Sequence, residues 1–383
     1  MAEHRKDRSL FQLIDKKKFD ALVEKWGVDA GVRTLSTAEL VDGLLNCLTL
    51  KLGSLREAEA VLGVRRSTLS DAMKERCSGF FQELCDVVLL DIRGRTNDRK
   101  VKRAVRELLA VDSSEIDVHG SMFDIPAWAK KRGEGNKAAG KLHVAWNVDG
   151  GWVEDFSVTG GRKHDSPAAK KLSLASGKTY VFDRAYNDYA FWALILQAGS
   201  HFVTRLRLCA AYKRLQARVL AEAGDRDGVL FDEVFSPGAE VAPKYRETIR
   251  LARFRRVIYR DPETKRVFHF LSSDPTLTAL QIAAVYKRRW AVELLFRWLK
   301  GHLGLRRLPM KNRNAIEVLL AVAVLLQLLL RLKQIIENYG GTLWQLLRAI
   351  RAAHHRKALS GGGSAAGQRG RAPPAAALTR RAS

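Results

Sequence analysis

LLAVDSSEIDV, residues 108–118, is the first of five strand-length apolar runs that decide the fold of this chain of 383 residues. The residues Asp149-Gly150-Gly151 favour a tight β-turn, so they predict a hairpin between the second apolar run (141–148) and the third (152–158). Helical patterns around residues 166–175 and 187–199 separate the last three runs. The sequence therefore predicts an α/β sheet in the order three strands, helix, strand, helix, strand. The later runs are KLHVAWNV (141–148), WVEDFSV (152–158), TYVFD (179–183) and HFVTRL (201–206).

This order of elements matches a ribonuclease-H-like sheet, although several α/β folds begin in a similar way. Residues 207–275 are interpreted as an insertion, in which a basic helical stretch precedes several extended segments. Strong helical patterns return at residues 277–300 and 313–352. We therefore expect an α/β domain interrupted by a β-rich insertion. The extended segments are GVLFDEVF (228–235), RETIRLARFRRVIYR (246–260) and RVFHFLSS (266–273).

The amino-terminal region, residues 1–100, carries apolar residues at helical spacing, and Ser36 or Thr37 is suited to cap one of its helices. Residues 54–81 predict a helix, a turn at Gly63 and a second helix capped near Ser67. A helix-turn-helix has this layout, and it would present Arg65 and Arg66 to DNA. A plain helical hairpin with a glycine at its turn is the alternative.

The charge balance favours a polyanionic partner. The chain has 66 Lys+Arg against 41 Asp+Glu, which gives a formal net charge of +25. Nucleic acid is the commonest polyanion that such a field attracts, and a ribosomal or membrane-surface protein is the alternative. We expect double-stranded DNA to be the partner.

Composition argues against membrane insertion, export and a structural zinc or disulfide framework. The apolar run Ala315 to Leu330 is short for a bilayer and contains Glu317 and Gln327, so we interpret it as a buried core helix. The amino terminus lacks an apolar signal core, and the four cysteines form no CxxC pair. These features favour a cytoplasmic protein. Residues 360–383 are basic and rich in Gly, Ala and Pro, a composition that predicts a disordered tail.

The segment YKRRWAVELLFRWLK, residues 286–300, carries the clearest chemical pattern. On one continuous helix, at ~100° per residue, its polar residues fall on a single stripe and the rest is apolar, so Trp290, Phe296 and Trp298 are expected in the core. A carboxylate among arginines on a buried helix needs a partner. Glu293 is either half of a structural ion pair or a metal ligand beside phosphate-binding cations. The stripe comprises Tyr286, Arg289, Glu293, Arg297 and Lys300.

The same segment resembles a known family. Tyr286, Arg289, Glu293 and Lys300 fit the Y-x2-R-x3-E-x6-K signature of bacterial insertion-sequence DDE transposases of the IS-four family. Upstream motifs extend the resemblance to about residues 50–335. They are VDSSEID (111–117), which looks like the family's first-Asp strand, KLHVAWNVDGG (141–151), GGRKHDS (160–166), VFDRAYNDY (181–189), which looks like the second-Asp segment, and SLREAEAVLGVRRSTLSDAMKER, which resembles the helical DNA-binding region.

The resemblance implies a ribonuclease-H-like transposase that cleaves DNA at terminal inverted repeats and transfers the 3′-OH ends into target DNA. Asp112, Asp183 and Glu293 would be catalytic and would hold two Mg²⁺, which Mn²⁺ could replace. Tyr286 would hold a displaced base, while Arg289 and Lys300 would grip phosphates. Stripe geometry adds Arg297, and adjacency to the second aspartate adds Arg184. The protein would pair two DNA ends, so we expect a homodimer, in the bacterial cytoplasm at the nucleoid.

The implied domains are a helical DNA-binding domain (1–100), a catalytic domain (105–335) with its insertion (about 207–275), a carboxy-terminal helix (336–359) and the tail. The chain departs from the family at Ser114, where Thr is common, and at Ala185, where Gly is common. An alanine at a position that needs positive φ would cost about 1 kcal/mol.

Two aspartates compete with the assigned ones. Asp117 lies five residues after Asp112, so the two point to opposite faces of a strand, and only the resemblance chooses Asp112. Asp188 competes with Asp183 but is better explained as a helix N-cap. His164, beside Asp165, either supports the site or is a satisfied loop histidine. The competing functions are a catalytically silent repressor derived from a transposase, and a nuclease that hydrolyses without joining.

Overall fold

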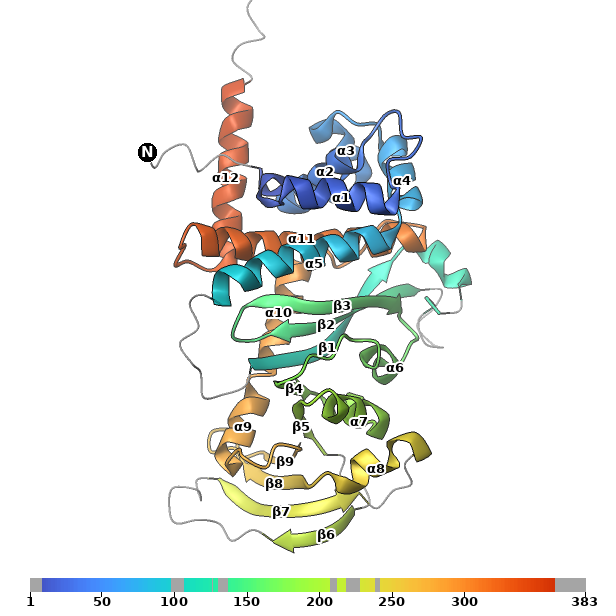
Figure 1. Ribbon diagram of the computed structural model, residues 1–383. Coiled ribbons are helices and arrows are strands. Elements are labelled where there is room, and N and C mark those ends of the chain that lie inside the picture. The colour runs from blue at the N-terminus through green and yellow to red at the C-terminus, as the bar shows by residue number, and fades with distance from the viewer. Residues whose placement is uncertain are drawn as a thin grey trace, which may run out of the picture.

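A computed structural model describes residues 9–97, 107–125, 127–129, 137–206, 212–217, 228–237 and 242–361. The expected tail, apart from residues 360 and 361, lies outside these residues. Figure 1 shows helices at one end of the molecule, a long sheet through its middle, and the strands of the insertion at the other end.

The first five strands form the sheet that the sequence predicts. They are β1 (Glu107–Val118), β2 (Ala138–Asn147), β3 (Trp152–Gly160), β4 (Lys178–Phe182) and β5 (His201–Arg205). Their spatial order is β3-β2-β1-β4-β5, in which β2 is antiparallel to β1 and β3 while β1, β4 and β5 are parallel. The hairpin turn 148–151 joins β2 to β3 as expected. This is the strand arrangement of a ribonuclease-H-like sheet.

The insertion lengthens the same sheet, because β9 (Val267–Ser272) pairs antiparallel with β5. Beyond it follow β8 (Phe254–Arg260), β7 (Val229–Pro237) and β6 (Tyr212–Ala217). Two local predictions were wrong. Part of the expected basic helical stretch is the edge strand β6, because it pairs with β7. The first half of 246–260 is the helix α8 (Pro243–Leu251), which has Pro at its first position and buries Ile249.

Alternation along β1 assigns its side chains to two cores. Leu109 and Val111 pack with α6 (Asp165–Ala169) and α7 (Tyr189–Gln197) in a cluster rich in aromatic rings. Leu108 and Ala110 belong to the other cluster, with α9 (Ala279–Lys287), α10 (Trp290–His302) and α11 (Arg313–Ile336). The even-numbered residues of this part of β1 therefore face α10.

The amino-terminal helices share that second core. They are α1 (Lys16–Trp26), α2 (Thr37–Leu50), α3 (Leu55–Leu62), α4 (Arg66–Glu75) and α5 (Ser78–Asn97), preceded by the short 3₁₀ turn η1 (Leu10–Leu13). Ser36 caps α2 in a capping box with Glu39, and Gly63 ends α3 with φ 68°, as predicted. The cap of α4, predicted near Ser67, lies at Arg65, and its side chain makes no capping hydrogen bond.

Helix α11 connects the amino-terminal helices to the sheet, and Figure 1 shows α5 beside it. Among the described residues it is the one helix long and apolar enough to cross a membrane, but 89% of its most apolar window is buried in the protein. Buried Gln327 accepts a hydrogen bond from the Val153 N–H at 3.1 Å and donates one to the Gly151 carbonyl at 3.0 Å. The expectation of a core helix is confirmed.

The predicted helix 313–352 is two helices, because α11 ends at Ile336 and α12 (Leu343–Gly361) begins after a turn. Asn338 has φ 51°, and Gly340 and Gly341 follow it. In Figure 1, α12 runs in a different direction from α11.

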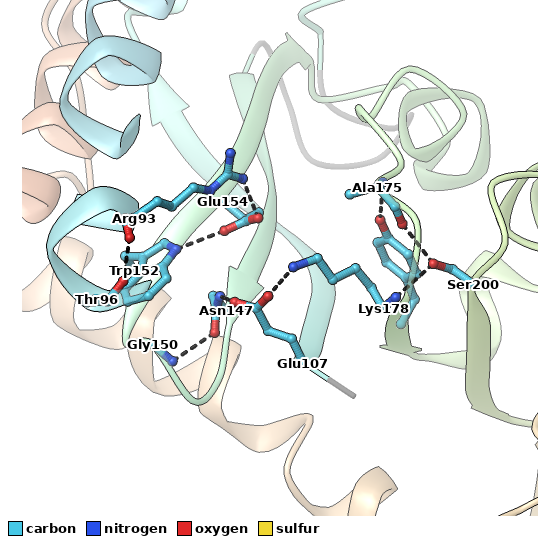
Figure 2. Close-up of polar contacts among 11 residues, drawn as sticks. Arg93, Thr96, Glu107, Asn147, Gly150, Trp152, Glu154, Ala175, Lys178 and Ser200 are labelled. Atoms are coloured by element: carbon cyan, nitrogen blue, oxygen red, sulfur yellow. Dashed lines mark hydrogen bonds and ion pairs between the residues drawn. The ribbon is translucent and has the colours of Figure 1, made fainter. Parts of the chain in front are cut away.

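Polar contacts hold the strands together where β1 and β4 begin (Figure 2). Glu107 of β1 accepts hydrogen bonds from Asn147 of β2 and from Lys178 of β4. These contacts hold three adjacent strands in register at the end of the sheet opposite the candidate site.

Candidate active site

Strand register places Asp112 and Asp183 side by side. In the parallel pair β1–β4, Ala110 lies beside Val181 and Val111 beside Phe182. Asp112 and Asp183 come one residue later, at the carboxyl end of β4. Both have the parity of Ala110 and Val181, so both face α9 and α10. The pairing of neighbouring strands thus brings two carboxylates 71 positions apart to one edge of the sheet.

Glu293 approaches from α10, in the first turn of that helix. The guanidinium of Arg289 lies between it and the first strand: Arg289 Nη1 donates to Asp112 Oδ2 at 3.1 Å, and Arg289 Nη2 donates to Glu293 Oε1. The prediction of one continuous helix over this segment was wrong. The chain turns at residues 288–289 between α9 and α10, and this turn directs Arg289 toward β1.

Burial dominates the electrostatics of Asp112. It raises the pKa of this carboxyl from its ordinary 3.8 to about 6. A hydrogen bond from the Ser113 N–H and the charge of Arg289 oppose the rise, while the charges of Glu293 and Asp183 add to it. The three carboxylates therefore interact with one another through a poorly solvated space.

The chemistry of this donor set fits a divalent cation. Three carboxylates offer the hard oxygen ligands that such ions prefer. Within the described ranges, no three His, Cys, Asp or Glu side chains already stand at metal-binding spacing. Arg289 is the physical reason, because its guanidinium occupies the space between Asp112 and Glu293 and serves there as a stand-in cation. A metal held by Asp112, Asp183 and Glu293 would have to displace it.

Basic side chains pair with aromatic rings on the segment that carries Glu293. Arg289 lies over the Tyr286 ring at 5.8 Å, and Arg297 lies over the Trp290 ring at 5.7 Å. Placing Trp290 in the core was wrong, because it is 49% exposed. Trp290 is the first residue of α10, directly after the turn at residues 288–289. Phe296 is buried as expected, while Trp298 is only partly buried.

The remaining sequence-predicted cations lie in two places. Arg184 is exposed and directly follows Asp183, and Lys300 lies two turns beyond Glu293 on α10. Arg65 and Arg66 are exposed at the start of α4, among the amino-terminal helices. The structure therefore places Arg289 against Asp112 and Glu293, Arg184 next to Asp183 in the chain, and Arg297 and Lys300 on the helix that carries Glu293. Arg65 and Arg66 lie on the amino-terminal helices instead.

An open cavity adjoins this group. Its volume is about 460 Å³, and Tyr259, Phe268, Phe270, Tyr286 and Trp290 contribute aromatic rings to its lining. Strands β8 and β9 supply three of these rings, so the insertion builds one wall of the cavity and α9–α10 the other. Arg289 also lines it. The cavity therefore opens beside the guanidinium that bridges the carboxylates.

The two rival aspartates lie elsewhere. Asp188 is the N-cap of α7 and accepts from the N–H groups of Ala190 and Phe191, as predicted. Asp117 is exposed, and its parity differs from that of Asp112. Its backbone bonds with Arg306 and Leu308, which lie on the loop after α10.

Sequence reasoning missed a polar cluster behind the site. Asp165 accepts hydrogen bonds from Ser113 and Lys141, and buried His143 lies next to it. The pKa of His143 falls to about 4, chiefly because of burial, so this imidazole is neutral at pH 7. The motif GGRKHDS contains Asp165, but the sequence predicted a role for His164 alone in this motif. His164 is exposed and precedes α6 without a side-chain cap bond.

Comparisons with known proteins identify the family of this chain. Residues 103–329 match the family described as "Transposase DDE domain". The chain is 29% identical over 279 residues to "Putative transposase y4zB" of Sinorhizobium fredii, across 72% of this chain and 74% of that relative. It is 27% identical over 328 residues to "Probable transposase for insertion sequence element IS5377" of Geobacillus stearothermophilus, across 84% and 82%.

Two further likenesses are weaker. The chain is 24% identical over 290 residues to "Putative transposase for insertion sequence element IS4SA" of Synechocystis sp., across 75% of this chain and 77% of the relative. A solved structure titled "Cryo-EM structure of piggyBac transposase synaptic complex with hairpin DNA (SNHP)" aligns over 96% of this chain and 84% of that one. Its TM-score is 0.47 and its identity 10%, too low to carry an argument.

Proposed function

Because the chain belongs to the family of bacterial insertion-sequence DDE transposases, it is a DNA transposase, and we propose that Asp112, Asp183 and Glu293 are its catalytic metal ligands. The observation that carries this proposal is the convergence of Asp112 and Glu293 on one guanidinium, with Asp183 beside Asp112 at the end of the neighbouring strand. DNA binding without cleavage does not need three converging carboxylates, so the repressor alternative is not favoured.

The family uses divalent metal ions, and we assign two Mg²⁺ to this site, with Mn²⁺ as a substitute. Such ions would lower the pKa of an attacking water or 3′-OH and stabilise the entering and leaving oxygens of the phosphodiester. The carboxylates of Asp112, Asp183 and Glu293 would hold the ions at the edge of the sheet. Burial of Asp112 supports this role, because a poorly solvated carboxylate gains more from a cation than an exposed one does.

We assign the surrounding cations to the DNA backbone. Arg289 would leave the carboxylates and turn to a phosphate beside the scissile bond, where its planar guanidinium suits two-point contact. Lys300, Arg297 and Arg184 would extend this contact along the strand. Tyr286 lines the 460 Å³ cavity, and its ring would hold a displaced base there.

Recognition of the terminal inverted repeats is assigned to α3–α4. This pair has the helix-turn-helix layout, and Arg65 and Arg66 stand exposed at the start of its second helix. Transfer of the 3′-OH ends into target DNA requires two ends at once, so we propose a homodimer on DNA. The protein would act in the bacterial cytoplasm, at the nucleoid.

The triad is tested by replacing Asp112 or Asp183 with Asn and Glu293 with Gln. Each variant is expected to lose at least about 10³-fold in cleavage of an inverted-repeat substrate with Mg²⁺, because a missing ligand disturbs both metal positions. Asp117→Asn is the matched control on β1 and should cleave like the wild type. Undiminished cleavage by any of the three variants would remove that residue from the site. A wild type that yields nicked ends without joined products would instead support the nuclease alternative.

A further inference from the structure

Asp165, the first residue of α6, connects the two strands behind the active site. Its Oδ1 atom accepts a hydrogen bond from Ser113 Oγ of β1 at 2.7 Å and one from Lys141 Nζ of β2 at 3.1 Å. His143 Nδ1 lies 3.9 Å from the same oxygen. Ser113 and His143 are paired across the strands, so all these side chains share the face opposite Asp112.

The chain before α6 is built to bring Asp165 to this face. An added Cβ at Gly160 would lie 2.1 Å from the Ala127 carbonyl oxygen, and one at Gly161 would lie 2.9 Å from Ala139. The end of β3 therefore passes close to the segment at Ala127, and the start of the following loop passes close to β2, at two positions where a side chain would collide. Lys141 Nζ also donates to the Lys163 carbonyl at 3.0 Å, which holds the loop from the other side.

Ser113 connects Asp165 to Asp112, the first candidate ligand. Its side chain binds Asp165 on one face of β1, while its backbone N–H donates to Asp112 Oδ1 on the other, at 2.8 Å. A shift of Ser113 would therefore move the group that orients the Asp112 carboxylate.

The next residue of α6 contacts the end of the turn that begins at the second candidate ligand, Asp183. Ser166 Oγ donates to Asp188 Oδ2 at 2.7 Å, and Lys170 Nζ pairs with the same oxygen at 2.8 Å. Asp188 ends the short turn that begins at Asp183 and contains η3 (Arg184–Tyr186). Asn187, in the same turn, donates from Nδ2 to the Arg205 carbonyl at 2.7 Å. The turn that carries Asp183 is thus held to α6 and to β5.

We propose that Asp165 and Ser166 are positioning residues that form a clasp between the segments carrying Asp112 and Asp183. The clasp sets the spacing of the two carboxylates from behind the sheet, without touching metal or DNA. This inference rests on the proposed function, because it assumes that the two aspartates share metal ions. Partners behind metal ligands commonly change metal affinity by about 10- to 100-fold, because the ions tolerate little displacement of their ligands.

The test compares Asp165→Ala, Ser166→Ala and Ser166→Thr in the full-length protein. Mn²⁺ binding without DNA is measured by electron paramagnetic resonance, and single-turnover cleavage is measured over a range of DNA concentrations. Both alanine variants are expected to bind Mn²⁺ about tenfold more weakly and to cleave at least about tenfold more slowly, with the KM for DNA unchanged. Ser166→Thr keeps the hydroxyl and should restore both quantities.

A merely structural role would lower the melting temperature while leaving Mn²⁺ affinity and the cleavage rate at wild-type values, and this result would overturn the clasp. The clasp would also be overturned if Ser166→Thr lost as much Mn²⁺ affinity and cleavage rate as Ser166→Ala. Lys171→Ala, at an exposed position just after α6, is the control. If Asp165→Ala does not fold, Asp165→Asn replaces it, since it keeps the side-chain shape and removes the charge.

The assay also separates this inference from the proposed function. Asp112→Asn and Asp183→Asn are measured in parallel and should lose Mn²⁺ binding. If they bind Mn²⁺ like the wild type, the metal assignment itself fails. If they lose binding while both alanine variants retain it, the assignment stands and the clasp fails.

Discussion

At the scale of single residues, Asp112 combines a proposed ligand position with an unusually high pKa. Its side chain is 20% exposed, and burial raises its pKa to about 6. A carboxyl whose folded pKa exceeds its unfolded value binds protons more tightly in the folded state. Its contribution to the free energy of unfolding therefore falls as pH rises from about 4 to about 6, and stays low above that range.

This fall in stability with rising pH predicts how Asp112→Asn changes the free energy of unfolding of the metal-free protein. Asn does not ionise, so the variant does not lose the unfolding free energy that the wild type loses at this position between pH 4 and 7. The difference in unfolding free energy, variant minus wild type, should rise by about 2 kcal/mol across that range, after allowance for partial exposure of the side chain. Urea denaturation at pH 4, 5, 6 and 7 measures it. A difference that stays constant would contradict the burial of this charge.

Replacing Arg289 is expected to raise divalent-ion affinity and to lower the cleavage rate. Arg289→Gln removes the cation that bridges Asp112 and Glu293, so divalent-ion affinity without DNA should rise roughly fivefold, the equivalent of about 1 kcal/mol of ion pairing. Cleavage should fall at least about tenfold, because the proposed contact of Arg289 with a phosphate is removed. Mn²⁺ titration and single-turnover cleavage measure the two quantities.

The neighbouring residue supplies the control for that change. Arg288→Gln removes the same side-chain type from a residue whose own partner is Asp149, at 2.5 Å, and should leave Mn²⁺ affinity unchanged. Weaker Mn²⁺ binding in Arg289→Gln would mean that the guanidinium organises the carboxylates rather than competing with the metal.

At the scale of elements, the site depends on how loops and turns join regular structure. Periodicity identified the first five strands because alternation of apolar residues is a local property of the chain. It did not identify the turn at residues 288–289, since the apolar spacing continues through it. The contact of Arg289 with Asp112, made across 177 positions, accompanies that turn. Local spacing therefore located the right residues and misjudged the shape of the helix that carries them.

Gly160 offers a prediction at this scale. In Gly160→Ala the new Cβ would meet the Ala127 carbonyl oxygen at 2.1 Å, so the loop before α6 must move. We expect a loss of about 3 kcal/mol in unfolding free energy, together with weaker Mn²⁺ binding if the clasp is displaced. Gly94→Ala is the matched control, because this exposed glycine of α5 has open space around it. That change should stabilise the protein by about 0.5–1 kcal/mol. Equal effects at both positions would refute the steric account.

At the scale of the whole molecule, one hydrophobic core runs from the amino-terminal helices through α11 to the sheet. Asn314, near the start of α11, binds three carbonyls at the end of α4 and accepts from the Ser78 N–H at 3.2 Å. The helix pair α3–α4, which we propose to recognise the inverted repeats, is therefore packed through α4 on α11, the helix that supports the sheet. The two proposed domains are physically coupled through α11.

This coupling predicts that α1–α5 and the sheet unfold in one transition. Circular dichroism and tryptophan fluorescence should report the same midpoint. Asn314→Ala removes hydrogen bonds to partly buried carbonyls and should lower the unfolding free energy by about 2 kcal/mol, with both signals shifting together. Arg313→Ala removes an exposed ion pair next to it and should change stability by less than about 0.5 kcal/mol. Two separate transitions in the wild type would contradict the shared core.

The sequence by itself determined the strand order of the first half of the sheet, the capped helices and the polar residues around which the site is proposed. These follow from periodicity, turn chemistry and fixed spacings, which need no knowledge of distant contacts. Only the tertiary structure decided that β6–β9 extend the same sheet, that Trp290 stands exposed and that Arg289 occupies the space between Asp112 and Glu293. It alone revealed Asp165 and Ser166 behind the two aspartates. Each of these depends on contacts between residues far apart in the chain, and no local pattern encodes which distant partner a side chain will meet.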